Sequence, residues 1–92
     1  MAFKKPKTTL EKRAVQFATD LLTKHDYSYT IPVGYEELSN ELKGRGVNIS
    51  FVTIISYWKT LERMGYATRS MKARKKGVTH KLNRYAFQKL IQ

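Results

Sequence analysis

The side chains best suited to chemistry lie in one stretch of the 92-residue chain, residues 48–63. If Ile54, Trp58 and Leu61 form the inner face of a helix here, polar side chains must face outward. The candidates are Asn48, Ser50, Thr53, Ser56, Tyr57, Lys59, Thr60 and Arg63. Small hydroxyls let a helix approach base edges closely, whereas Lys and Arg suit phosphates or guanine. A merely solvated helix face would look the same, so this row needs support from the rest of the chain.

The sequence lacks the residue sets that catalysis usually requires. The two histidines, His25 and His80, are far apart in the chain, and there is no cysteine to act as nucleophile, metal ligand or disulfide partner. The adjacent acids Glu36 and Glu37 suit the first turn of a helix. We therefore expect no enzyme, no metal, no cofactor and no small-molecule substrate.

Positive charge is concentrated in the last third of the chain. Eighteen Lys and Arg oppose seven Asp and Glu, for a net charge of +11. Residues 63–92 contain nine of the bases and none of the acids. Charge of one sign gathered in one region favours a polyanionic partner. The candidate contacts there are Arg69, Lys72, Arg74, Lys75, Lys76, His80 and Lys81, joined by Lys4, Lys5 and Lys7 at the N-terminus.

The apolar content, 41% of residues, predicts a folded domain rather than a polycationic tail. No run of about eighteen apolar residues exists that could span a membrane, and the basic start is not followed by an apolar signal core. We expect a cytoplasmic protein without membrane contact, associated with the nucleoid if the source is bacterial.

Apolar spacing predicts three helices. Residues 9–25 carry one stripe, from Leu10 to Leu22, with Thr8 or Thr9 as N-cap. Residues 35–43 form a second helix, which Gly44 would end in the left-handed conformation. A glycine-containing turn of about six residues follows. The third helix covers residues 51–64, with Asn48 or Ser50 as cap, Gly65 as stop, and inner positions Phe51, Ile54, Trp58 and Leu61.

The remaining segments read as extended chain. Residues 26–33 favour a short edge strand, since Pro32 lacks a ladder donor. Alternation in residues 66–71 and 79–87 predicts two strands, joined by the basic loop 72–77 into a hairpin. Leu82, Tyr85, Ala86 and Leu90 also match helical spacing, so a C-terminal helix is the alternative to the return strand.

At this point the chain resembles the winged helix-turn-helix family. The resemblance is carried by Tyr35-Glu36-Glu37-Leu38, by Leu61-Glu62-Arg63-Met64-Gly65-Tyr66, and by the loop 72–77 as wing tip. It implies an α+β fold of three helices and a C-terminal β-hairpin wing, with a short extra strand between the first and second helices. We expect a flexible basic arm over residues 1–8 and this domain over residues 9–92. The turn between the second and third helices is longer than in the simplest members.

The resemblance implies sequence-specific binding of double-stranded DNA by a small transcriptional regulator or a plasmid or phage maintenance factor. The helix from Ser50 would read the major groove while the wing and the arm hold the backbone. Because one such module covers little DNA, we expect a homodimer. The alternatives are an RNA-binding or ribosome-associated protein on the same scaffold, and a protein-interaction module whose wing meets an acidic partner.

Overall fold

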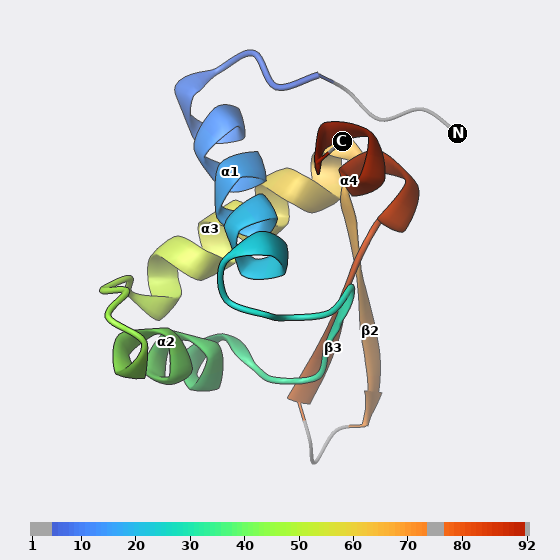
Figure 1. Cartoon of the computed structure of the whole chain (residues 1–92). Helices are drawn as coiled ribbons and strands as arrows, with labels where there is room; N and C mark the ends of the chain where they lie inside the picture. Colours follow the sequence, from blue (N-terminus) through green and yellow to red (C-terminus); the bar gives the residue numbers. More distant parts are fainter. Residues whose placement is uncertain (1–4, 74–76, 92) are drawn as a thin grey trace.

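The computed structural model describes residues 5–73 and 77–91 of the chain. This part is an α+β domain with four helices and a three-stranded antiparallel sheet (Figure 1). In chain order the elements are α1 (Thr9–Thr23), β1 (Thr30–Ile31), α2 (Tyr35–Gly44), α3 (Phe51–Met64), β2 (Ala67–Ala73), β3 (Gly77–Leu82) and α4 (Arg84–Ile91).

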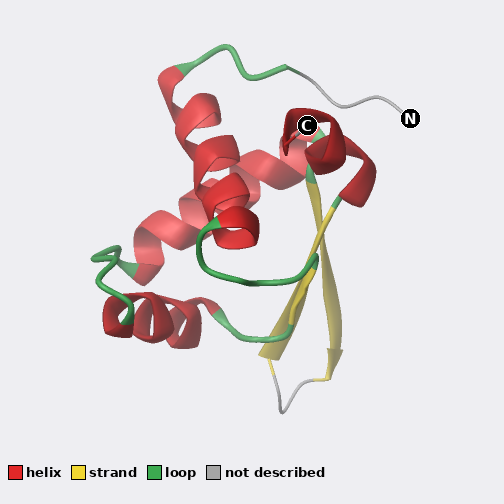
Figure 2. Cartoon of the chain, viewed as in Figure 1, coloured by secondary structure: helices red, strands yellow, loops and turns green. Residues whose placement is uncertain are grey.

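The sheet has the order β1-β3-β2, with β3 in the centre. The hairpin predicted after the third helix is confirmed as β2 and β3, which pair antiparallel with Ala67 opposite Leu82 and Arg69 opposite His80. Their register is irregular between Ser70 and Ala73. The short extended segment is confirmed as β1, an edge strand paired to β3 through Thr30 and Ile31. The hairpin thus stands beside the helices and projects away from them (Figure 2).

Helix α1 begins with a capping box. The Thr8 hydroxyl accepts a hydrogen bond from the Glu11 amide at 3.1 Å, and the Glu11 carboxylate accepts one from the Thr8 amide at 3.1 Å. These bonds satisfy amide groups that a helix start leaves without intrahelical partners. The helix is therefore confirmed with Thr8 as its cap, but it ends at Thr23 rather than His25. Leu10, expected on the buried stripe, is 42% exposed because it lies in the first turn.

Helix α3 has the bounds that its caps predict. The Ser50 hydroxyl accepts from the Thr53 amide at 3.2 Å, and Gly65 closes the helix in the left-handed conformation at φ 86°. For α2 the expected stop is wrong, because Gly44 is still helical. The left-handed residue there is Gly46, at φ 88°, one position after the cap residue Arg45.

The core lies where α1, α2 and the sheet meet the inner face of α3. Ile54, Trp58 and Leu61 have no exposed surface, as predicted, whereas Phe51 is 40% exposed. The ring of Trp58 lies 6.1 Å from Phe17 of α1 and 4.9 Å from His80 of β3. A single indole therefore joins two helices and the sheet.

The return strand predicted over residues 79–87 is wrong beyond Leu82, because α4 begins at Arg84. Asn83 makes the change of direction. Its amide donates to the Tyr66 carbonyl at 2.7 Å, its side-chain nitrogen donates to the Gly65 carbonyl at 3.1 Å, and its side-chain oxygen accepts from the Ala86 amide at 3.3 Å. Asn83 thus caps α4 and ties it to the end of α3, which buries Phe87 against Tyr66.

Candidate nucleic-acid interface

The outward face of α3 carries fewer hydroxyls than the sequence predicted. Val52 is 63% exposed, Lys59 is exposed, and Ile55 and Ser56 between them are half-buried. Residues three, four and seven positions apart share one side of a helix, so these four form a continuous strip. We call residues 52, 55, 56 and 59 the outer strip of α3. It begins apolar and ends with a cation.

Ser50 and Thr53 lie beside the start of the outer strip but are partly committed to the cap. Besides the cap bond to the Thr53 amide, the two hydroxyls lie 3.1 Å apart and share a hydrogen bond. Ser50 is exposed and Thr53 is half-buried, while Asn48 is exposed in the preceding turn. The structure therefore brings all three predicted residues to the N-terminal end of α3.

Three other candidates, Tyr57, Thr60 and Arg63, form a separate ridge that faces α1. They follow one another in steps of three residues, which keeps them on neighbouring lines of the helix surface. The Tyr57 ring lies 5.3 Å from the Phe17 ring of α1, and Arg63 Nη2 lies 3.4 Å from Glu11 Oε2. The predicted outward position of Thr60 is wrong: it is 2% exposed and its hydroxyl donates to the Ser56 carbonyl at 3.0 Å.

The contact between Glu11 and Arg63 has an electrostatic signature. Hydrogen bonds from the Lys7 and Thr8 backbone amides lower the pKa of Glu11 below its ordinary 4.5, and the Arg63 guanidinium lowers it further. The carboxylate is thus held in its charged form, which favours the ion pair. Arg63 remains exposed, but its charge is partly engaged within the protein.

His80 is a correction to the predicted wing contacts. It is 1% exposed, and its ring lies 4.9 Å from Trp58 and 4.8 Å from Tyr35. Successive side chains of a strand point to opposite faces, so burying His80 against the helices turns Lys81 outward. Lys81 is exposed, and its contact with a polyanion stays a prediction.

The other predicted cations divide into those that the structure places and those that it does not. Arg69 and Lys72 belong to β2, and their side chains lie outside the description. Arg74, Lys75, Lys76 and Lys4 lie outside the described residues altogether. Lys5 and Lys7 precede α1 with exposed side chains, and the Lys7 amide donates to Glu11 at 2.8 Å.

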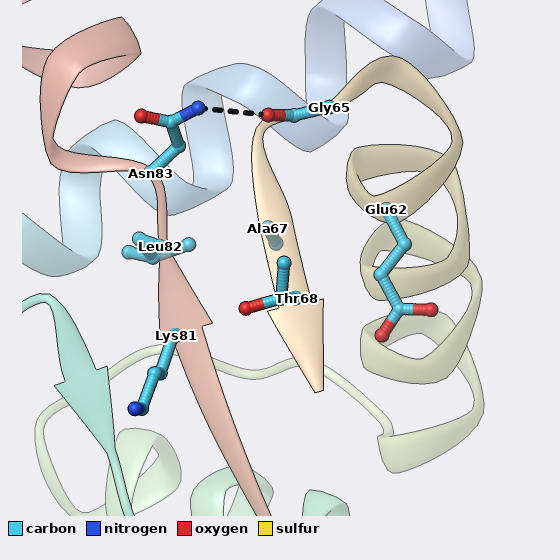
Figure 3. Close-up of a pocket in the computed structure, with 7 residues that line it drawn as sticks. All are labelled: Glu62, Gly65, Ala67, Thr68, Lys81, Leu82 and Asn83. Carbon is cyan, nitrogen blue, oxygen red and sulfur yellow. Dashed lines mark hydrogen bonds between the residues drawn. The ribbon is translucent and has the colours of Figure 1, made fainter. Parts of the chain in front are cut away.

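A shallow pocket of about 340 Å³ marks the junction between the end of α3 and the hairpin (Figure 3). Glu62 comes from α3 and Lys81 from β3, and the Asn83–Gly65 hydrogen bond closes one end. The remaining lining residues are Ala67, Thr68 and Leu82. Asn83 organises this junction but was not among the predicted residues. Its signal was an Asn, a favoured N-cap residue, directly before a segment with helical apolar spacing.

Within the described residues, no group of three or more His, Asp or Glu side chains is arranged to hold a metal ion. Nor does any helix among them have the length and apolarity needed to cross a membrane. Comparison of the chain with protein-family models, with curated proteins and with solved structures found no match.

Proposed function

We propose that this chain is a winged helix protein that binds double-stranded DNA sequence-specifically, with α3 in the major groove and the β2–β3 hairpin as its wing. The order helix, strand, helix, helix, hairpin supports this class, and α4 is an addition to it. The observation that carries the proposal is the outer strip of α3. Its two ends, Val52 and Lys59, are exposed on a helix whose opposite face is fully buried, directly before a basic hairpin.

In this proposal the outer strip of α3 and the hairpin contact different parts of the DNA. The outer strip approaches base edges, with Ser56 as a hydroxyl partner and Lys59 reaching guanine or phosphate. Lys81 and the other hairpin cations contact the phosphate backbone, and Lys5 and Lys7 add contacts from the N-terminal segment. If six to eight cations engage phosphates, the logarithm of the binding constant falls with the logarithm of salt at a slope of roughly −5 to −7.

A second copy of the chain belongs to this proposal, because a single module buries only about 600–1,000 Å² on DNA. Leu90 of α4 supports it. It follows Ala86 and Phe87 by four and three positions and so shares their side of the helix, yet it is 46% exposed where they are buried. Light scattering of the wild type and of Leu90→Lys tests the pairing. We expect a dimer that the substitution dissociates; a wild-type monomer that DNA leaves unchanged would refute it.

Selection of bound duplexes from a random library at two salt concentrations tests the function itself. We expect enrichment of a palindromic site at the higher salt, where phosphate contacts alone no longer retain DNA. Structured RNA serves as competitor, because the deep, narrow major groove of A-form RNA does not admit α3. RNA that displaces the enriched duplex would favour the RNA-binding alternative. Absence of any nucleic-acid binding at low salt would favour a protein-interaction module.

A further inference from the structure

The first turn of α3 exposes two large apolar side chains. Phe51 is 40% exposed and Val52 is 63% exposed, although α3 buries Ile54, Trp58 and Leu61 completely. Scattered exposed apolar residues are ordinary on a protein surface. These two are adjacent, and Val52 begins the outer strip that continues through Ile55 to Lys59. Their position at the start of α3, next to the outer strip, and not their exposure alone, indicates that they contact a partner.

The charges around this turn indicate what that partner is. Between Glu41 and Glu62 the chain has no acidic residue, whereas Lys43 precedes this turn and Lys59 follows it, both exposed. An apolar turn with cations on either side of it along the chain suits a partner that carries both anionic and apolar groups. The major groove of B-DNA carries both where thymine occurs, since its C5-methyl group lies between two rows of phosphates.

We propose that Phe51 and Val52 determine sequence specificity by contacting thymine methyl groups in the major groove. This inference rests on the proposed function, because it requires α3 to enter that groove. Thymine is the only base whose major-groove edge carries an apolar group, so the contact distinguishes it from the other three. It also distinguishes thymine from uracil, which has the same hydrogen-bonding edge without the methyl group.

The test uses the full chain and the duplex that it enriches from a random library. Each thymine of that duplex is replaced in turn by deoxyuridine, and binding is measured by fluorescence anisotropy at fixed salt. We expect about a fourfold loss of affinity for each contacted methyl group, the effect of exposing one buried methyl-sized group. Val52→Ala should weaken the thymine duplex by a similar factor and leave affinity for one deoxyuridine duplex unchanged. Phe51→Ala should do the same at a neighbouring position.

Leu10→Ala is the matched control, because it shortens another exposed apolar side chain, on α1 rather than α3. It should leave the thymine-to-deoxyuridine ratio unchanged, and circular dichroism should show all three variants folded. An enriched site without thymine would overturn the inference. Equal binding of the thymine and deoxyuridine duplexes would also overturn it, and so would a Val52→Ala loss of affinity that is the same on both duplexes. In each of these cases, specific binding of a duplex would still support the proposed function. Failure to bind any duplex would overturn both.

Discussion

The first and last turns of α3 differ in what surrounds their outward side chains. At the start, the apolar side chains of Phe51 and Val52 are exposed. At the end, Arg63 is paired to Glu11 and the nearby Thr60 is buried, because α1 packs along this side. One helix thus holds the domain together at one end and presents side chains at the other. Helical position alone therefore does not identify a contact residue; the neighbouring helix decides.

The largest expected effect separates the inner face of α3 from its outer strip. Trp58→Ala should lower the free energy of unfolding by about 3–5 kcal/mol, the cost of a cavity in place of a buried aromatic. Val52→Ala, at an exposed position of the same helix, should change it by less than about 0.5 kcal/mol. Urea denaturation measures both. A folded Trp58→Ala protein that only loses DNA binding would contradict the assignment of Trp58 to the core.

Thr60 tests the ridge that faces α1. Thr60→Val keeps the shape of the side chain but removes the hydroxyl that donates to the Ser56 carbonyl. We expect a loss of about 1 kcal/mol in unfolding free energy, because the hydrogen bond is removed and a hydroxyl is replaced at a buried site. DNA affinity of the folded variant should be unchanged. If the variant instead kept its unfolding free energy and lost DNA affinity, Thr60 would be a DNA contact, as the sequence predicted.

Lys59 and Arg63 compare two cations one turn apart on α3. Lys59→Ala should weaken binding to all duplexes and reduce the magnitude of the salt slope by about 0.9, the value of one phosphate contact. Arg63→Ala should have the smaller effect on binding, since the guanidinium already pairs with Glu11. Titrations at several salt concentrations provide both slopes. The reverse order of effects would place the DNA along the end of α3 instead of its start.

The smallest expected effect is the response of the Glu11 contact to acid. The folded state lowers the pKa of Glu11 below 4.5 through the Lys7 and Thr8 amides and Arg63. The carboxylate therefore contributes stability that is complete above about pH 4.5 and is lost as the pH falls through the lowered pKa. Glu11→Gln should reduce the acid-dependent part of the unfolding free energy. An unchanged pH profile in the variant would show that Glu11 does not carry this dependence.

The helices were predictable from the sequence because their signals are local. The stripe beginning at Leu10, the caps Thr8 and Ser50, and the stop Gly65 each act within a turn or two of their own positions. The C-terminal helix was only the alternative to the return strand, although Asn83 is an equally local signal for its start. Residues 79–87 alternate like a strand, and the bonds from Asn83 to Gly65 and Tyr66 that end the strand are made across the fold.

The candidate site was predictable only in part, for the same reason. The apolar spacing correctly predicted that Ile54, Trp58 and Leu61 face inward and that Lys59 faces outward. It could not show that Thr60 would be buried on the side where Tyr57 and Arg63 contact α1, because that depends on how two helices pack. Nor could it show that pairing of β3 with β1 and β2 would turn His80 toward Trp58, since a shift of one residue in the register would have exposed it.

The account depends on α3 presenting its first turns to duplex DNA, and amide chemical-shift mapping tests this directly. The folded chain would be titrated with its enriched duplex while backbone amide signals are followed. We expect the largest shifts at residues 48–59 and in the hairpin, with small shifts along the inner side of α1. Largest shifts on α4, or none at saturating duplex, would contradict the account.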